Sequence, residues 1–243
     1  EVGSSVRASR IAYNRLNGSF ANINPNQIDW EKALEGADYL HWTGISPGIS
    51  ESAYIALKKG LQTANEKGIE ITADPAYRSN LWKYGKEGFE VLKELVSYST
   101  IFIGGVNEIN EIIGTKFSSD KESFIEACKE FQKQMPSIKK IFDKVRVGAS
   151  ASTQETQGRA WANETYFESE PIEILQVVDR IGTGDAFAAG LIYGLLNFDD
   201  ETALKFGNAA CAIKHTVPGD INHCSASDIL DVMNGDKGGR IKR

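Results

Sequence analysis

The sequence has 243 residues but only three cysteines, and their positions exclude two kinds of site. Cys128, Cys211 and Cys224 show no paired spacing, so neither a disulfide framework nor a zinc site is predicted. Unpaired cysteines are typical of a reducing compartment, and we expect this protein in the cytoplasm. Long hydrophobic runs are missing too: the longest covers residues 186–198, 13 residues, whereas a membrane helix needs about 20. We therefore expect no membrane partner.

Histidine is equally scarce, and its three residues, His41, His215 and His223, share no metal-ligand spacing. His41 lies in an apolar strand pattern and is expected to be a core residue with its hydrogen bonds satisfied. His215 is expected either in the core or in contact with a nucleotide. Cys128 and Cys211 lie at helical spacing from apolar residues, so we expect them to fill the core rather than to act as nucleophiles.

Positive charge is in short supply, with 27 Lys and Arg against 33 Asp and Glu, which gives a net charge of −6. Such a chain repels a phosphate backbone unless a basic patch is segregated on one face, and no such patch occurs, so a nucleic-acid partner is not expected. Two nucleotide-binding motifs are also absent. No G-x-x-x-x-G-K-[ST] string occurs, and Phe187 replaces the third glycine of a G-x-G-x-x-G motif. The sequence thus disfavours P-loop and dinucleotide-binding proteins.

The sequence does contain an alternation of strand and helix patterns, which is typical of a parallel sheet covered by helices. Strands are predicted over residues 38–45, 69–75 and 101–106. Helices are predicted over residues 50–68, 86–99, 107–113 and 120–135, with Ser50 as the cap and Gly68 as the stop of the first. Extended segments over residues 139–150, 158–169 and 172–178 predict an antiparallel edge, after which helices return.

Residues 6–16 alternate between apolar and polar side chains, which predicts a half-exposed strand. No repeat or linker follows, so one main α/β domain is expected.

In open α/β sheets, ligands bind at the carboxyl ends of the strands. Several polar segments follow predicted strands and are expected to share that rim: residues 44–47, 74–78, 107–108 and 179–185.

The last of these segments contains Gly182-Thr183-Gly184-Asp185, directly before an apolar helix. A helix N-terminus presents unpaired N–H groups and the positive end of the helix dipole, and the glycines leave room for a phosphate. The dipole favours the ionised form of Asp185. Such an acid suits a base that takes the proton of a hydroxyl group while the amides hold a phosphoryl group. A plain alternative is a tight turn whose acid stabilises the helix by about 0.3–1 kcal/mol.

The stretch DRIGTGDAFAAGLIYGLL, residues 179–196, closely resembles the C-terminal motif of the PfkB, or ribokinase-like, carbohydrate kinases. Four more segments, IAYNR, HWTGI, DPAYRSNLW and KHTVPGD, resemble those of 2-keto-3-deoxygluconate kinases in matching order. The resemblance covers essentially the whole chain. It implies a ribokinase-like α/β fold, a doubly wound and mainly parallel sheet with a small β lid. Residues 1–20 would form part of the lid and residues 21–243 the α/β domain, with the family's first strands preceding Glu1.

The resemblance also implies an activity, the transfer of the ATP γ-phosphoryl group, with Mg²⁺, to the terminal hydroxyl of the sugar acid 2-keto-3-deoxygluconate. Asp185 is the implied base, and Gly182, Thr183 and Gly184 form the implied anion hole. Arginine suits a substrate carboxylate because its planar fork binds both oxygens. The implied substrate residues are Tyr13, Arg15, Ile45 and Arg78, and the implied nucleotide residues are Asn107, Gly148 and Asn208. Asp179 matches a ligand of a monovalent cation, K⁺, and the lid suggests a homo-oligomer.

Two segments depart from the family pattern. The family's N-x-x-E or N-x-x-D reads Asn107-Glu108-Ile109-Asn110, and VRVGASAS, residues 145–152, lacks the T-x-G-x-x-G spacing. Two alternatives therefore stay open: another sugar or nucleoside kinase of this family, or a member that binds ligands without turnover. Simpler roles also stay open for four residues. Tyr13 and Arg15 suit the polar face of an edge strand, and Arg78 and Asp179 suit ion pairs with neighbouring side chains.

Overall fold

The computed structural model describes residues 3, 5–8, 10–12, 14–15, 17–147 and 152–235. The chain divides into two compact units. Unit 1 comprises Glu1–Ile11, Asp143–Ala160 and Tyr166–Arg243, and unit 2 comprises Ala12–Phe142 and Trp161–Thr165.

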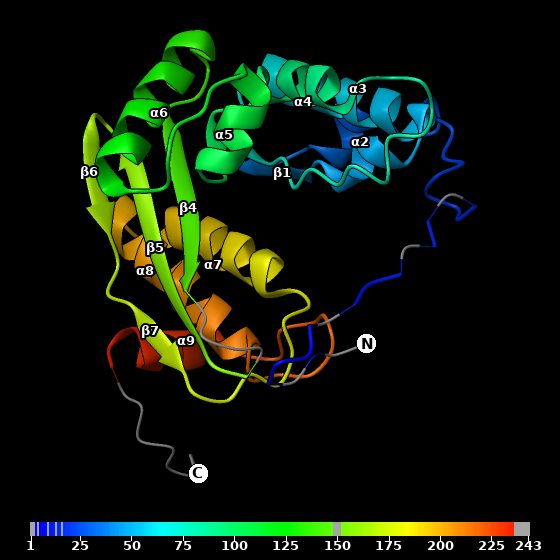
Figure 1. Cartoon of the computed structure of the whole chain (residues 1–243). Helices are drawn as coiled ribbons and strands as arrows, with labels where there is room; N and C mark the ends of the chain where they lie inside the picture. The colour runs from blue at the N-terminus through cyan, green and yellow to red at the C-terminus, as the bar shows by residue number, and fades with distance from the viewer. Residues whose placement is uncertain are drawn as a thin grey trace. The chain divides into compact units, whose positions relative to one another are not determined.

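Unit 2 contains a parallel sheet, as the sequence predicts (Figure 1). Ile101 pairs with Thr72 on one side and with Lys140 on the other, and Tyr39 pairs with Glu70. The strands are β1 (Tyr39–Thr43), β2 (Glu70–Asp74), β3 (Ile101–Ile103) and the first residues of β4 (Lys140–Val147). Residues 140–142 therefore extend the parallel sheet, which corrects their assignment to the antiparallel edge.

Two of the predicted helices of unit 2 begin at side-chain caps, and the first of these caps is the predicted Ser50. The Ser50 side chain accepts a hydrogen bond from the Ala53 amide, and the Asp120 side chain accepts one from the Ser123 amide. Caps of this kind stabilise a helix by about 1 kcal/mol. The helices are α1 (Trp30–Ala33), α2 (Ile45–Ile49), α3 (Glu51–Glu66), α4 (Gly88–Val96), α5 (Val106–Ile113) and α6 (Lys121–Gln134). Neither α1 nor α2 was predicted, and the strand expected to reach Ile45 ends at Thr43.

The core of unit 2 lies between the sheet and its helices. Phe102 of β3 and Phe131 of α6 have ring centroids 4.7 Å apart, and both side chains are fully buried. Cys128 lies on the same buried face of α6, which confirms its prediction as a core residue. His41 is exposed instead of lying in the core, and its Nδ1 lies 2.8 Å from Thr72 Oγ1. The prediction was wrong because β1 is the first strand in the pairing order of the described sheet. Side chains of such an edge strand pack against fewer neighbours than those of a central strand.

Unit 1 contains the antiparallel strands and the last helices. Gln154 of β5 pairs with Ile174 of β7 in antiparallel register, which confirms the expected antiparallel edge. In pairing order the strands run β1-β2-β3-β4-β5-β6, with β7 beside β5. The elements are β5 (Gln154–Ala162), β6 (Thr165–Glu168), β7 (Ile172–Ile174), α7 (Thr183–Asn197), α8 (Asp200–Lys214) and α9 (Ala226–Met233).

Helices α7 and α8 pack side by side through glycines (Figure 1). An added Cβ on Gly190 would lie 2.7 Å from the Ala210 Cβ, and one on Gly194 would lie 2.6 Å from the Ala203 Cα. Both distances are shorter than any ordinary contact of a Cβ atom, so the two backbones approach as closely as glycine allows. This packing fixes the direction of α7, whose first turn carries the Gly-Thr-Gly-Asp segment.

The strand predicted over residues 6–16 is not formed by the described residues of that range, which carry a single bridge at Arg7 and are otherwise irregular. Alternation alone does not make a strand without a partner strand to complete its hydrogen bonds. The assignment of residues 1–20 to a lid stays a prediction. Among the described helices, none combines the length and the apolar character needed to cross a bilayer.

Candidate active site

The turn before α7 is shaped around Gly182. This residue has φ 77° and ψ 2°, in the left-handed region, and it precedes the first helical residue, Thr183. A Cβ added to Gly182 would lie 2.2 Å from the carbonyl oxygen of Asp220. Glycine is therefore required here twice, by the backbone conformation and by the close approach of a second backbone segment.

The amides of this turn are open. No side chain caps the start of α7, and the Thr183 amide has only a long contact, 3.4 Å, with the Arg180 carbonyl oxygen. No residue in the described part of the chain accepts a hydrogen bond from the amide of Gly184 or Asp185. A Cβ added to Gly184 would meet no atom within 4 Å. The turn thus presents N–H groups and free space to an anion.

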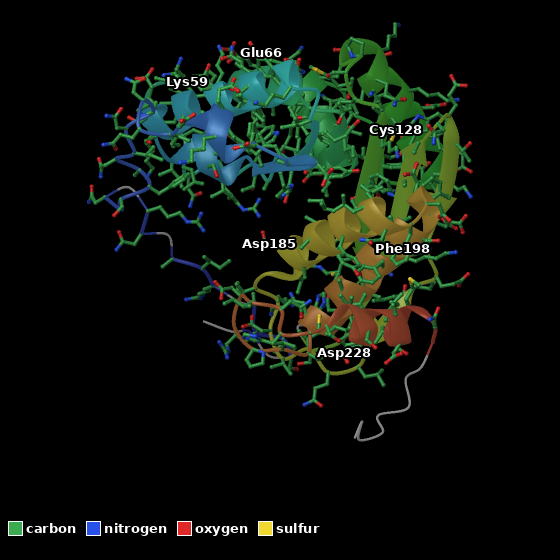
Figure 2. All side chains as sticks on the ribbon, turned by 180° about the vertical axis from the view of Figure 1, so that it is seen from behind. Lys59, Glu66, Cys128, Asp185, Phe198 and Asp228 are labelled. Atoms are coloured by element: carbon green, nitrogen blue, oxygen red, sulfur yellow. The ribbon has the colours of Figure 1, made fainter. Side chains whose placement is uncertain are left out.

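Asp185 lies in the first turn of α7 with its side chain exposed (Figure 2). Within the described residues its carboxylate takes part in no hydrogen bond or ion pair. Asp199 at the start of α8 differs, because its side chain caps the helix by accepting the Thr202 amide at 2.8 Å. The alternative role, an acid that stabilises the start of its own helix, therefore describes Asp199 better than Asp185. The Asp185 carboxylate is left to accept a proton beside the open amides.

Asp179 ties the turn to a second segment of unit 1. It is 7% exposed, its Oδ1 accepts the Ile181 amide at 3.0 Å, and its Oδ2 accepts the Gly219 amide at 3.0 Å. Burial alone would raise the pKa of the Asp179 carboxyl, but these backbone donors, with Arg180 N–H and the charge of Lys214, bring the net pKa below its ordinary value. The carboxylate is therefore held ionised by the backbone that it connects.

Asn208, predicted to contact the nucleotide, is completely buried. Its Nδ2 donates to the carbonyl oxygens of Thr156 and Glu170, at 3.1 and 3.3 Å, and its Oδ1 accepts the Thr156 hydroxyl at 3.0 Å. These bonds join α8 to β5 and use both ends of the amide. The structure thus gives Asn208 a role in packing, and its contact with a nucleotide stays a prediction.

Unit 2 places its predicted site residues after parallel strands. Ile45 begins α2 directly after β1, and its amide donates to Thr43 Oγ1 at 3.4 Å. Arg78 follows β2, is exposed, and donates through Nη1 to the Tyr77 carbonyl oxygen at 2.8 Å. Asn107 follows β3 and is exposed in the first turn of α5. Because β1, β2 and β3 are parallel, these residues lie at one edge of the sheet in unit 2.

The altered Asn107 segment is explained by local hydrogen bonds. Glu108 Oε2 accepts the Gly105 amide at 3.0 Å, so this acid caps its own helix. Asn110 donates to the Phe117 carbonyl oxygen at 2.8 Å and accepts the Phe117 amide at 2.9 Å. Asn110, which stands where the family has an acid, therefore holds a loop instead. Asn107 is the member of the motif with an exposed side chain.

Tyr13 and Gly148 lie outside the described residues, so their predicted roles are not located. Arg15 is exposed in an irregular segment of unit 2. Cys211 and His215 are fully buried, which confirms Cys211 as a core residue. His215 Nδ1 lies 2.8 Å from the Cys211 carbonyl oxygen, and burial lowers the pKa of His215 to about 4. Its ring has no surface for a nucleotide and belongs to the core.

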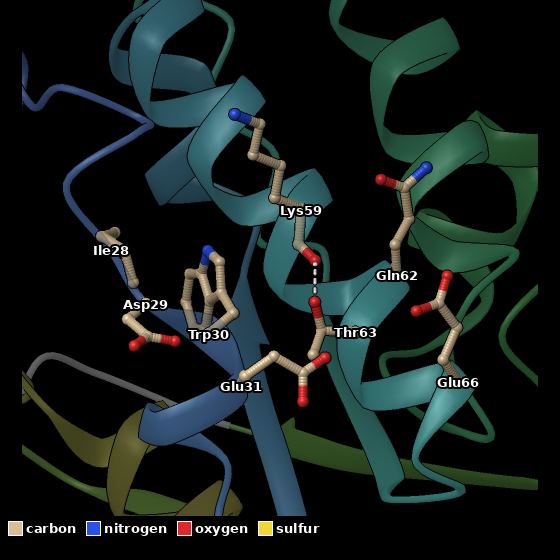
Figure 3. Close-up of a pocket in the computed structure, with 8 residues that line it drawn as sticks. All are labelled: Ile28, Asp29, Trp30, Glu31, Lys59, Gln62, Thr63 and Glu66. Carbon is tan, nitrogen blue, oxygen red and sulfur yellow. Dashed lines mark hydrogen bonds between the residues drawn. The ribbon is translucent and has the colours of Figure 1, made fainter.

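Two cavities are lined within single units. One, of about 330 Å³, lies between α1 and α3 of unit 2 beside Trp30 and Lys59 (Figure 3). It contains none of the predicted site residues. The other, of about 510 Å³, lies in unit 1 between Glu170, Lys205 and Met233, and Asn208 is part of its wall. Neither contains Asp185.

Three residues beside the turn were missed from the sequence: Lys214, Gly219 and Asp220. All three lie in the segment KHTVPGD, which was noted only for its resemblance. A signal was present, because Pro218-Gly219 is a strong turn pair and a turn after a helix brings two backbone segments together. Which segment it meets depends on long-range packing and is not visible in the sequence.

The chain is similar to known sugar-acid kinases. The chain is 26% identical over 241 residues to a 2-dehydro-3-deoxygalactonokinase of Haloferax volcanii, covering 98% of this chain and 70% of that protein. It is 24% identical over 214 residues to a 2-dehydro-3-deoxygluconokinase of Bacillus subtilis, covering 88% of this chain and 61% of that protein. The chain therefore spans about two thirds of the length of these curated relatives.

A solved structure is similar as well. The crystal structure of a 2-dehydro-3-deoxygluconokinase from Thermotoga maritima has a TM-score of 0.90 and 30% identity, covering 97% of this chain and 72% of that one. The expected ribokinase-like α/β fold is thereby confirmed. The family model described as pfkB family carbohydrate kinase matches residues 7–227. With its open Gly-Thr-Gly turn and free Asp185 before a helix, this chain belongs to the pfkB family of carbohydrate kinases.

Proposed function

We propose that the protein transfers the γ-phosphoryl group of ATP to the terminal hydroxyl of 2-keto-3-deoxygluconate or a closely related sugar acid. The observation that carries this proposal is the pairing of open amides at Gly184 with the unengaged carboxylate of Asp185. The names of the relatives, which are kinases of 2-keto-3-deoxy sugar acids, support the substrate class.

Phosphoryl transfer in this site follows from charge and position. The amides of Gly182, Thr183 and Gly184 would hold the γ-phosphoryl oxygens as negative charge shifts during the transfer. Asp185 would take the proton of the sugar hydroxyl as its oxygen bonds to phosphorus and the bond from phosphorus to the bridging oxygen of ADP breaks. A base in this role contributes about 10² to 10⁴ to the rate.

The metal ion of this reaction would arrive with the nucleotide. Within the described ranges there is no group of three or more His, Cys, Asp or Glu side chains that could hold a metal ion. Mg²⁺ is commonly held by substrate phosphates and one or two protein ligands rather than by a cage of protein side chains, so this finding suits MgATP as the substrate. Asn107, Gly148 and Asn208 remain the proposed nucleotide contacts.

The sugar acid would be held through its carboxylate and hydroxyl groups. Arg78 is exposed at the end of β2, and a guanidinium binds a carboxylate through two parallel hydrogen bonds. Tyr13, Arg15 and the backbone near Ile45 complete the proposed substrate set. Self-association through the lid and a cytoplasmic location are proposed with the same function.

The test is a panel of substrates assayed for ATP consumption in the presence of Mg²⁺. The panel contains 2-keto-3-deoxygluconate, its galacto epimer, gluconate, ribose, fructose and adenosine. We expect the two 2-keto-3-deoxy acids to give the highest kcat/KM. Preference for a neutral sugar or a nucleoside would contradict the substrate, and ligand binding without turnover would contradict the enzymatic role.

A further inference from the structure

Lys214, the last residue of α8, is completely buried. Its Nζ donates a hydrogen bond to the Val217 carbonyl oxygen at 2.8 Å. Lysine is almost never fully buried unless its charge is paired, because removing an ammonium group from water is costly. Its position therefore requires a compensating partner, and the proposed mechanism does not use this residue.

The turn that Lys214 closes contacts the segment that leads into Gly182-Thr183-Gly184, which is the anion turn. The amides of Val178 and Asp179 donate to the His215 carbonyl oxygen, at 2.8 and 3.2 Å. Gly219 donates to Asp179 Oδ2 at 3.0 Å, and the Asp220 carbonyl oxygen fills the space beside Gly182. The segment 215–220 thus contacts the segment 178–182 at His215, Gly219 and Asp220, and its shape sets the position of the open amides.

Asp179 is an acid bound to the same turn: its Oδ2 accepts the Gly219 amide at 3.0 Å, two residues after Val217, whose carbonyl oxygen accepts the hydrogen bond of Lys214 Nζ. The charge of Lys214 lowers the pKa of the Asp179 carboxyl further, in addition to the larger effect of the backbone donors of Ile181 and Gly219. The arrangement is a buried cation and a buried anion, each anchored by backbone hydrogen bonds. Removing the ammonium group would leave the Val217 carbonyl oxygen without its buried donor and take away a charge that favours the ionised form of Asp179.

These residues do not fit a bound K⁺ at Asp179. Each carboxylate oxygen already accepts a backbone amide at 3.0 Å, and the Val217 carbonyl oxygen of the same turn already accepts a hydrogen bond from the Lys214 ammonium at 2.8 Å. A second cation at this turn would compete with that ammonium for the carbonyl oxygen and would be repelled by its charge. The monovalent cation suggested by the family resemblance is therefore redundant at this position.

We propose that Lys214 is a positioning residue whose ammonium group replaces a monovalent cation beneath the anion turn. It holds the 217–220 turn against Gly182 and makes phosphoryl transfer independent of K⁺. The kinetic tests of this inference rest on the proposed function. The final test measures the stability of the protein and does not depend on that function.

The first experiment exchanges the cation. Wild-type turnover of the best substrate in the panel is measured at equal ionic strength in the chlorides of K⁺, Na⁺ and tetramethylammonium. We expect kcat to agree within about twofold in the three salts, a difference below 0.5 kcal/mol in barrier height. Activation of about tenfold or more by K⁺ over tetramethylammonium overturns the inference.

The second experiment removes the ammonium group. In Lys214→Met we expect kcat to fall about 10- to 100-fold with little change in the KM of the sugar, because displaced amides weaken the transition state more than ground-state binding. The control is Lys205→Met, on the same helix but half exposed and paired with Glu201 at 2.7 Å, which leaves kcat unchanged. An unchanged kcat in Lys214→Met overturns the inference.

Chemical rescue separates positioning from mere packing. Lys214→Ser opens a space in which methylammonium or K⁺ is expected to raise kcat, while neither affects the wild type. A failure of both cations to raise kcat in a folded Lys214→Ser contradicts the role of the charge. If the serine variant does not fold, Lys214→Arg, which keeps the charge, serves in its place and is expected to retain more activity than Lys214→Met.

The last experiment does not require the protein to turn over a substrate. The Tm of the wild type is compared in K⁺ and tetramethylammonium chloride, and we expect the same value in both. A rise in Tm that is specific to K⁺ overturns the inference, because a bound cation stabilises the folded state. If the protein phosphorylates no member of the panel, the proposed function fails, while this measurement still decides the inference.

Discussion

Gly182 lies so close to Asp220 that an added Cβ would fall 2.2 Å from the Asp220 carbonyl oxygen. Two residues further on, an added Cβ on Gly184 would meet nothing within 4 Å. The two glycines of one turn therefore serve different purposes. Gly182 allows the backbone to take its path, and Gly184 keeps the space above the amides open for a ligand.

We expect Gly182→Ala to lower the free energy of unfolding by about 1–3 kcal/mol, because alanine is strained at φ 77° and clashes with Asp220. Gly184→Ala is the matched control. Its methyl group enters open space in a helical turn, so stability stays within about 1 kcal/mol of the wild type while turnover falls. Urea unfolding and steady-state kinetics of both variants test this pair. Normal turnover in Gly184→Ala would show that the phosphoryl group does not approach this amide.

Asp185→Asn is expected to reduce kcat by about 10² to 10⁴ because the amide cannot accept the proton of the sugar hydroxyl. Binding of the sugar and of ATP, measured by calorimetry, is expected to change little. The control is Asp199→Asn at the start of α8, where asparagine caps a helix as well as aspartate does and turnover stays normal. Equal turnover in Asp185→Asn and wild type rules out Asp185 as the base.

Much of the fold was predictable because local signals agree with the final packing. The cap at Ser50 and the periodicity of residues 120–135 placed α3 and α6, and alternating strand and helix patterns predicted the parallel sheet. The glycine turn before α7 was recognised because open amides at a helix start suit an anion and because the segment resembles the PfkB motif. These features depend on neighbours in the sequence.

The features that were missed depend on distant residues. The strand ends at Thr43 because Gly44 lies against Pro75, where an added Cβ would fall 1.7 Å from the carbonyl oxygen, and α2 follows. The turn at Asn163 and Glu164 has positive φ at both residues and lacks the usual glycine, so it was not recognised. In the sequence, Lys214 looks like an ordinary lysine at the end of a helix. Only the packed structure shows that it is buried.

Replacing Arg78 by Met tests the proposed acid substrate. A charged hydrogen bond to a carboxylate contributes about 1.5–3 kcal/mol, so we expect kcat/KM for a 2-keto-3-deoxy acid to fall about 10- to 100-fold. The rate with a neutral sugar is expected to stay the same. Lys83→Met, an exposed cation on the same segment, is the control and affects neither substrate. An equal loss with acid and neutral substrates would assign Arg78 to the structure of its loop instead.

His215 predicts how stability depends on pH. Burial lowers the pKa of His215 to about 4 in the folded state, whereas an unfolded histidine titrates near 6.5. As pH falls from about 6.5 to 4, the unfolded chain binds a proton that the folded protein does not, so the free energy of unfolding decreases. The slope approaches one proton, about 1.4 kcal/mol per pH unit, and the total loss is up to about 3 kcal/mol.

Urea unfolding at several pH values in this window measures the slope for the wild type and for His215→Asn. Carboxylates such as Asp179, whose pKa lies below its ordinary value, contribute at still lower pH and do not mask the effect. The variant is less stable at pH 7, because a buried hydrogen bond to the Cys211 carbonyl is altered, but its stability changes less between pH 6.5 and 4. Identical slopes in the two proteins would mean that His215 is charged in the folded state, which its complete burial opposes.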